Sequence, residues 1–169
     1  MTNWQTFSDL VAERVRKVRK SRGMTAQDLA EKCATPEVGA PEITAQTLSN
    51  IETGRRDKDG RRRRAVTVDE FMSLAAALQI QPVDLLVPPE LDDDAPFSIA
   101  PGAAMTAGAA RDWISGVGFL PSAGPAEMAR ALQEMPKSRQ SLVATRWLQR
   151  TNRSLAQEQG DQDGGESDG

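Results

Sequence analysis

The sequence predicts an all-α fold, in which five helices across residues 8–87 form one small domain. Apolar residues recur in these helices about every three to four positions, which is the spacing of one helix face. A threonine that can cap a helix stands before three of them, and glycine or proline marks several of their ends. A linker and a small helical C-terminal segment follow the domain.

The first two helices are predicted from an apolar stripe and from a capping motif. Within residues 8–21 three valines recur at helical spacing, and Gly23 can end this helix in the left-handed conformation. Thr25 can then cap a second helix, which reaches to about Cys33. Asp28, three residues after the cap, completes an acidic variant of the capping box.

A loop separates the second helix from the third. Two prolines and a glycine within residues 34–42 predict irregular structure there. Thr44 is the expected cap of a third helix, which Gly54 ends. Because Leu48 and Ile51 share one face of this helix, its other face is left with small polar side chains.

Two further predicted helices complete the domain at residues 8–87. Thr67 and Glu70 form a second capping box, which opens a helix at residues 68–78. Pro82 suits the first position of a short fifth helix.

The rest of the chain divides by composition. Residues 88–124 are rich in proline, glycine and alanine and are expected to be a linker. Residues 125–157 are expected to form the C-terminal helical segment, and the acidic tail at residues 158–169 is expected to be disordered.

Charge is unevenly distributed along the 169 residues, which carry a net charge of −3. Residues 1–70 carry a net +3 and residues 71–169 a net −6. Residues 54–66, directly after the third helix, hold seven basic and two acidic side chains. A solvated loop is the ordinary interpretation of such a run, but its position beside an exposed polar helix favours contact with phosphate.

Composition excludes several classes of protein. With one cysteine, Cys33, and no histidine, the chain cannot form an internal disulfide and lacks the common zinc ligands. No stretch approaches the roughly 20 apolar residues of a membrane span, and residues 1–10 lack the features of a signal peptide. We therefore expect a cytoplasmic protein that uses no metal or cofactor. Without a phosphate loop or a histidine for general-base chemistry, it is not expected to be an enzyme.

The residues that mark these helices form a set that resembles a known signature. They are Arg19, Thr25, Leu29, Ala30, Ile51, Glu52 and Gly54. In this order and spacing, together with the fourth and fifth helices, they resemble the phage-repressor-like (XRE) family of helix-turn-helix transcription regulators. The resemblance covers residues 10–87 and implies a five-helix lambda-repressor-like DNA-binding domain.

The resemblance implies a structural ion pair and a DNA interface. Arg19 and Glu52 would brace the first helix against the third, since a guanidinium can hold a carboxylate with two parallel hydrogen bonds. The base-reading residues would be those at the start and on the outer face of the third helix, namely Thr44, Ala45, Gln46, Ser49 and Asn50. Gln46 and Asn50 are the strongest candidates, because Gln and Asn can bond bidentately to adenine. Thr44 can serve simply as a helix cap.

Phosphate contacts are expected from two places. Thr25 and Gln27 lie at the start of the second helix, where backbone amides can meet a phosphate. The basic loop after the third helix is longer than in the family, and so is the turn before that helix. We expect contacts to the DNA backbone or minor groove from the arginines of this loop, which are Arg55, Arg56, Arg61, Arg62, Arg63 and Arg64.

The sequence therefore predicts a regulator that binds double-stranded DNA in a sequence-specific way, most simply a repressor that occludes its operator. The alternative is an antitoxin-like protein that binds its own promoter and holds a partner protein through residues 125–157. A self-cleaving Ser-Lys peptidase is disfavoured, because Lys137 is the sole lysine of the C-terminal part and no run of strands follows residue 100. Dimerisation on a palindromic site remains open.

Overall fold

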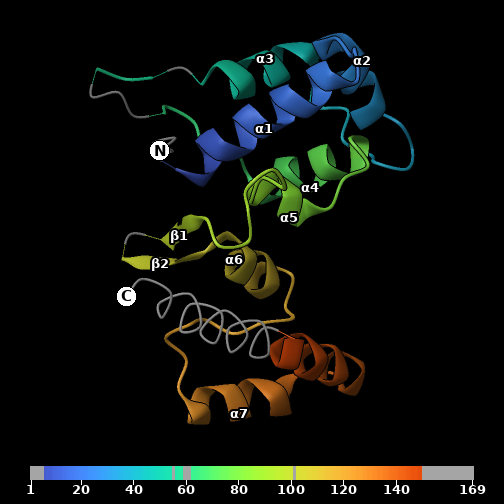
Figure 1. Ribbon diagram of the computed structural model, residues 1–169. Helices are drawn as coiled ribbons and strands as arrows, with labels where there is room; N and C mark the ends of the chain where they lie inside the picture. Colours follow the sequence, from blue (N-terminus) through green and yellow to red (C-terminus); the bar gives the residue numbers. More distant parts are fainter. Residues whose placement is uncertain (1–5, 55, 59–61, 101, 150–169) are drawn as a thin grey trace, which may run out of the picture. The chain divides into compact units, whose positions relative to one another are not determined.

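The computed structural model describes residues 6–54, 56–58, 62–100 and 102–149 (Figure 1). The chain divides after Glu90 into two compact units, Met1–Glu90 and Leu91–Gly169. The expected tail at residues 158–169 lies outside the described residues, as do residues 150–157 of the expected C-terminal helical segment.

Helices make up most of the described part of the first unit. They are α1 (Phe7–Ser21), α2 (Ala26–Cys33), α3 (Ala45–Thr53), α4 (Val68–Ala77) and α5 (Pro82–Leu86). The ends of these helices lie within about two residues of the positions that apolar stripes, caps and terminal glycines predict. This is the ordinary uncertainty of a helix end.

Threonine begins each of the first four helices. The hydroxyl oxygen of the capping residue accepts a hydrogen bond from the backbone amide three residues later, at Thr6, Thr25, Thr44 and Thr67. In α2 and α4 the side chain of that third residue also bonds back to the cap, which completes the two predicted capping boxes. Replacing such a cap by alanine costs about 1 kcal/mol.

The core of the first unit lies where these helices meet. α1 packs against α3 and α5, and α2 packs against α3 and α4, as Figure 1 shows. The largest fully buried side chains are contributed by every helix and by the loop before α3: Val15, Leu29, Ile43, Leu48, Ile51, Leu74, Leu78 and Leu85. Burying one such side chain stabilises the fold by about 1.5–3 kcal/mol.

The long segment between α2 and α3 is attached to this core. The backbone amide of Ala40 donates to the carbonyl of Cys33 at 2.8 Å. Ala40 and Ile43 are both buried. The segment between α2 and α3 therefore contributes side chains to the core of the first unit.

The end of α4 and the end of the unit are held by charged side chains of α1 and of the turn after it. Arg22 donates to the carbonyl of Leu78, the C-cap residue of α4. Glu90 accepts hydrogen bonds from Arg14 at 2.6 Å and from Lys17 at 3.0 Å. Although desolvation opposes ionisation, these hydrogen bonds lower the pKa of Glu90 to about 2.

The second unit contains strands, so the prediction of an all-α fold is wrong. β1 (Pro96–Ala100) pairs antiparallel with β2 (Ala103–Thr106). Phe97 of β1 is buried, and β1 contacts the helix that follows, α6 (Ala107–Ile114). Residues 88–124, which composition favoured as a linker, therefore hold a folded hairpin and a helix.

The helices of the second unit are joined by polar contacts. Beyond α7 (Pro125–Glu134), residues 137–149 are also helical. Arg146 in that helix donates to the buried Asp112 of α6 at 2.9 Å. Nowhere in the described parts of the chain does a helix have both the length and the apolar character needed to cross a membrane.

Candidate nucleic-acid interface

Four of the five residues expected to read bases are exposed at the start and on the outer face of α3. They are Thr44, Gln46, Ser49 and Asn50. Ala45, in contrast, is half-buried and packs against the core of the first unit, so it does not lie on the outer face where it was expected. Leu48 and Ile51 face the core from the opposite side of the same helix. This helix is thus held by its apolar face while its polar face is free to meet a ligand.

Gln46 and Asn50 form one hydrogen-bonded unit on this face. The side-chain amide nitrogen of Gln46 donates to the side-chain oxygen of Asn50 at 3.2 Å. This bond uses one of the two N–H groups of Gln46 and leaves its carbonyl oxygen as an acceptor. The amide nitrogen of Asn50 remains a donor. An acceptor beside a donor is complementary to the major-groove edge of adenine, which presents N6–H and N7.

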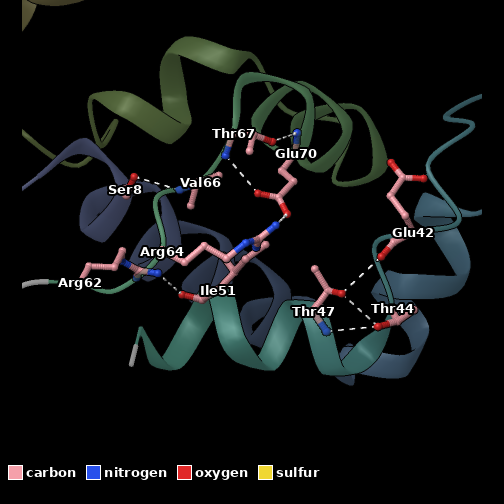
Figure 2. A network of polar contacts seen from close by, with 10 residues as sticks. All are labelled: Ser8, Glu42, Thr44, Thr47, Ile51, Arg62, Arg64, Val66, Thr67 and Glu70. Atoms are coloured by element: carbon pink, nitrogen blue, oxygen red, sulfur yellow. Dashed lines mark hydrogen bonds and ion pairs between the residues drawn. The ribbon is translucent and has the colours of Figure 1, made fainter. Parts of the chain in front are cut away.

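The start of α3 is fixed by two threonines (Figure 2). The backbone amide of Thr47 donates to the Thr44 hydroxyl at 3.2 Å, and the two hydroxyl oxygens lie 3.1 Å apart. The Thr47 hydroxyl also donates to the carbonyl of Glu42 at 3.3 Å. Thr44 therefore caps the helix, and its side chain is already engaged by α3 itself.

The structure brings Arg19 and Glu52 together. Nε and one terminal nitrogen of Arg19 donate to the two carboxylate oxygens of Glu52, each at 2.6 Å. A third bond runs from Arg19 to the carbonyl of Met24 at 2.7 Å. The hydrogen bonds with Glu52 raise the pKa of Arg19 above its ordinary value. The pair joins α1 to α3 and fixes the end of the helix that carries Gln46 and Asn50.

The start of α2 already holds a carboxylate. Thr25 and Gln27 are exposed there, as a phosphate contact requires. The backbone amide of Thr25, however, donates to the Asp28 carboxylate at 2.8 Å, and this hydrogen bond lowers the pKa of Asp28. The Gln27 amide donates to Glu31 at 3.0 Å. A phosphate at this end would meet the negative charge of Asp28.

The described parts of the basic loop after α3 are residues 56–58 and 62–64, which we call the arginine arm. Arg56 and Arg62 form an antiparallel bridge between its two stretches. The arm leaves α3 through Gly54, whose φ of +54° is the left-handed conformation that favours glycine. Lys58 and Arg63 are exposed on it. Arg55 and Arg61, also expected at phosphate, lie outside the described residues.

Arg62 is placed differently from what phosphate binding requires. Its side chain is 6% exposed and donates to Asp9 at 3.1 Å. It also donates to the carbonyl of Ile51 at 2.8 Å, a bond that Figure 2 shows. A Cβ at Gly54 would lie 2.7 Å from its guanidinium. Arg62 is thus packed between α1 and α3, and the expectation that it binds phosphate is replaced by a structural role.

The other side of the arm's base is attached to α4 and α1. Arg64 donates to Glu70 at 2.5 Å while its side chain stays 56% exposed. The backbone amide of Val66 donates to the Ser8 hydroxyl at 3.0 Å, as Figure 2 shows. Arg64 therefore keeps exposed surface, and among the described arginines of the loop Arg56, Arg63 and Arg64 remain candidates for phosphate.

Sequence reasoning missed Asp9 as part of this region. Asp9 stands in the first turn of α1, where an acidic residue is common because it complements the helix dipole. Nothing local distinguishes it from any other acidic residue at a helix start. Its contact with the arginine arm spans about half the unit in sequence and arises only in the folded chain.

Comparison with known proteins adds no relative, since the chain matches no family model, no curated protein and no solved structure.

Proposed function

We propose that this protein is a transcription regulator of the phage-repressor-like helix-turn-helix type, which binds specific sites on double-stranded DNA. The observation that carries the proposal is the exposed Gln46–Asn50 pair on a helix that leads directly into the arginine arm. One element would read bases and the next would hold the DNA backbone, which is the division of roles found in protein–DNA interfaces.

The physical argument begins with the fit of α3. A helix can enter the major groove, where each base pair presents a distinct pattern of donors and acceptors. Gln46 and Asn50 would read an A·T pair there, and Ser49 would contact a neighbouring base or phosphate. The ion pair between Arg19 and Glu52 would keep α3 in one orientation. The helix would then be ordered when the protein folds, and DNA binding would not have to order it.

The arginine arm would supply the affinity that does not depend on sequence. Lys58 and Arg63 are exposed, and Arg64 keeps more than half of its side chain accessible. Such groups neutralise phosphates and release counterions from DNA. Occlusion of a promoter is the simplest way for a compact DNA reader to act, so we propose a repressor that works in the cytoplasm.

A second candidate function is favoured by one observation in the second unit. Leu142, Trp147 and Leu148 are each more than half exposed on the helix at residues 137–149. An antitoxin-like protein would bind its own promoter through the first unit and a partner protein through such a surface. Co-purification with the product of a neighbouring toxin gene would favour this function over simple repression.

Selection from a random DNA library tests the main proposal. The full-length protein is incubated with randomised duplexes, and the bound fraction is sequenced after several rounds. We expect one enriched motif that contains A·T pairs; a palindromic motif would indicate a dimer, since half-sites mirror protein symmetry. Absence of any enrichment at low salt would contradict sequence-specific binding.

A further inference from the structure

We propose that Asp9 is a positioning residue for DNA binding: it holds the arginine arm in the geometry that meets the DNA backbone beside α3. This inference rests on the proposed function and adds a residue that lies on neither the base-reading helix nor the arm.

One buried carboxylate connects the start of α1 to both stretches of the arm. Asp9 is 9% exposed. Its Oδ1 accepts hydrogen bonds from Arg56 and from Arg62, each at 3.1 Å. Its Oδ2 accepts a hydrogen bond from the Thr6 hydroxyl at 3.1 Å, so the carboxylate itself is fixed by the cap of α1. Arg56 and Arg62 are the two bridged residues, and Asp9 therefore closes the base of the arm.

Arg62 carries this connection on to the base-reading helix. While its Nε donates to Asp9, its NH1 donates to the carbonyl of Ile51 in the last turn of α3, as Figure 2 shows for the latter bond. A guanidinium can make both bonds at once because its donors point in different directions from one plane. The position of the arm is thus set relative to α3, while Lys58 and Arg63 are left exposed.

Anchoring and electrostatics make opposite predictions for the loss of Asp9. A carboxylate close to the DNA-facing arginines repels phosphate, so its removal should strengthen binding to any duplex if charge alone matters. An anchored arm, in contrast, has lost its conformational freedom before DNA arrives. If the arm is released, each of its long side chains must instead be ordered when DNA binds, and this ordering weakens binding.

The decisive comparison is between Asp9→Asn and Asp69→Asn in the full-length protein. Both changes remove one negative charge from the first turn of a helix, but Asp69 is exposed. Affinity for a mixed-sequence duplex is measured over a range of salt concentrations. We expect Asp9→Asn to bind up to about tenfold more weakly and its slope of log affinity against log salt to flatten by about 0.9 per lost phosphate contact. Asp69→Asn should bind as tightly as the unchanged protein or more tightly.

Arg62→Lys provides a test that keeps the net charge. Lysine can bind a phosphate as a point charge, but its single nitrogen cannot stand in for both Nε and NH1, from which Arg62 bonds Asp9 and the Ile51 carbonyl. If Arg62 is an anchor, this variant should lose affinity as Asp9→Asn does. Circular dichroism at the assay temperature establishes that each variant is folded, and if Asp9→Asn does not fold, Arg62→Lys decides the question.

The outcomes separate the two proposals. If the unchanged protein binds no duplex, the proposed function fails and the role of Asp9 fails with it. If it binds DNA but Asp9→Asn behaves like Asp69→Asn, or Arg62→Lys binds normally, the positioning role alone is overturned.

Discussion

Arg19 and Glu52 join the end of α1 to the end of α3 through a bidentate pair whose side chains are only 10% and 7% exposed. The two residues lie 33 positions apart in the sequence. Each charge of a pair so shielded from water depends on the other for compensation. Loss of one partner leaves the other as an uncompensated buried charge, which destabilises the fold.

Removing either partner should therefore destabilise the first unit. Arg19→Ala or Glu52→Ala leaves a buried charge without its partner, and we expect each to lower the free energy of unfolding by about 3 kcal/mol. The double variant should lose much less than the sum, as contacting residues do. Urea unfolding followed by circular dichroism measures all three, with the exposed Lys20→Ala as the control. Additive losses would mean that the two residues do not interact in solution.

Changes on the outer face of α3 should affect specificity rather than folding. Gln46→Ala or Asn50→Ala should weaken binding to the selected DNA site by about 1–3 kcal/mol, because each removes half of a unit suited to adenine. Binding to random DNA should change little. Gln81→Ala, at an exposed position before α5, is the matched control. Equal losses on selected and random duplexes would show that another element reads the bases.

The thiol of Cys33 should be chemically silent in the folded protein. Burial, with a smaller effect of the Glu42 charge, raises the pKa of Cys33 from 9.0 to about 11. A thiol reagent at pH 8 should therefore react slowly until the chain is unfolded in urea. Rapid reaction under native conditions would contradict the buried position.

The same shift gives a pH dependence of stability with a definite sign. The unfolded chain loses the thiol proton first, so the contribution of Cys33 to stability is complete below pH 9.0 and is lost as pH rises toward about 11. Urea unfolding across this range measures the loss. Cys33→Ala should show a smaller decline over the same interval, since it has no thiol to ionise.

A glycine at residue 79 should stabilise the protein. Gln79 follows α4 with φ at +48°, a conformation that costs a side chain about 1 kcal/mol and costs glycine almost nothing. After subtracting the greater freedom of glycine in the unfolded chain, we expect Gln79→Gly to gain about 0.5 kcal/mol. Gly23→Ala is the mirror control: its φ is +67° and no atom lies near the added Cβ, so it should lose about 1 kcal/mol through conformation alone.

The predictable part of the fold is the part determined by local signals. Threonine caps, the glycines after α1 and α3 and the apolar spacing each act within a turn or two of helix, and they placed α1 to α5. The two strands were missed because they lack such local signals. β1 and β2 carry few β-branched residues and no clear alternation, and their pairing depends on the hairpin itself and on the burial of Phe97 beside α6.

Part of the candidate site could likewise be predicted from local signals, and part of it could not. Gln46 and Asn50 could be placed on an exposed face because Leu48 and Ile51 define the opposite one. Their mutual hydrogen bond follows from a spacing of four residues on a helix. The sequence contains four consecutive arginines, however, and nothing local separates Arg62 from its neighbours. Only the folded positions of Asp9 and the Ile51 carbonyl distinguish an anchor from residues that face solvent.

The long turn between α2 and α3 cannot be trimmed as an exposed surface loop could. Ala40 and Ile43 fill space in the core that a shorter turn would leave empty. Shortening the turn past Ala40 and Ile43 would remove two buried side chains from the core. The turn is therefore part of the core as well as a connection between two helices, and its length cannot be changed independently of the packing that it completes.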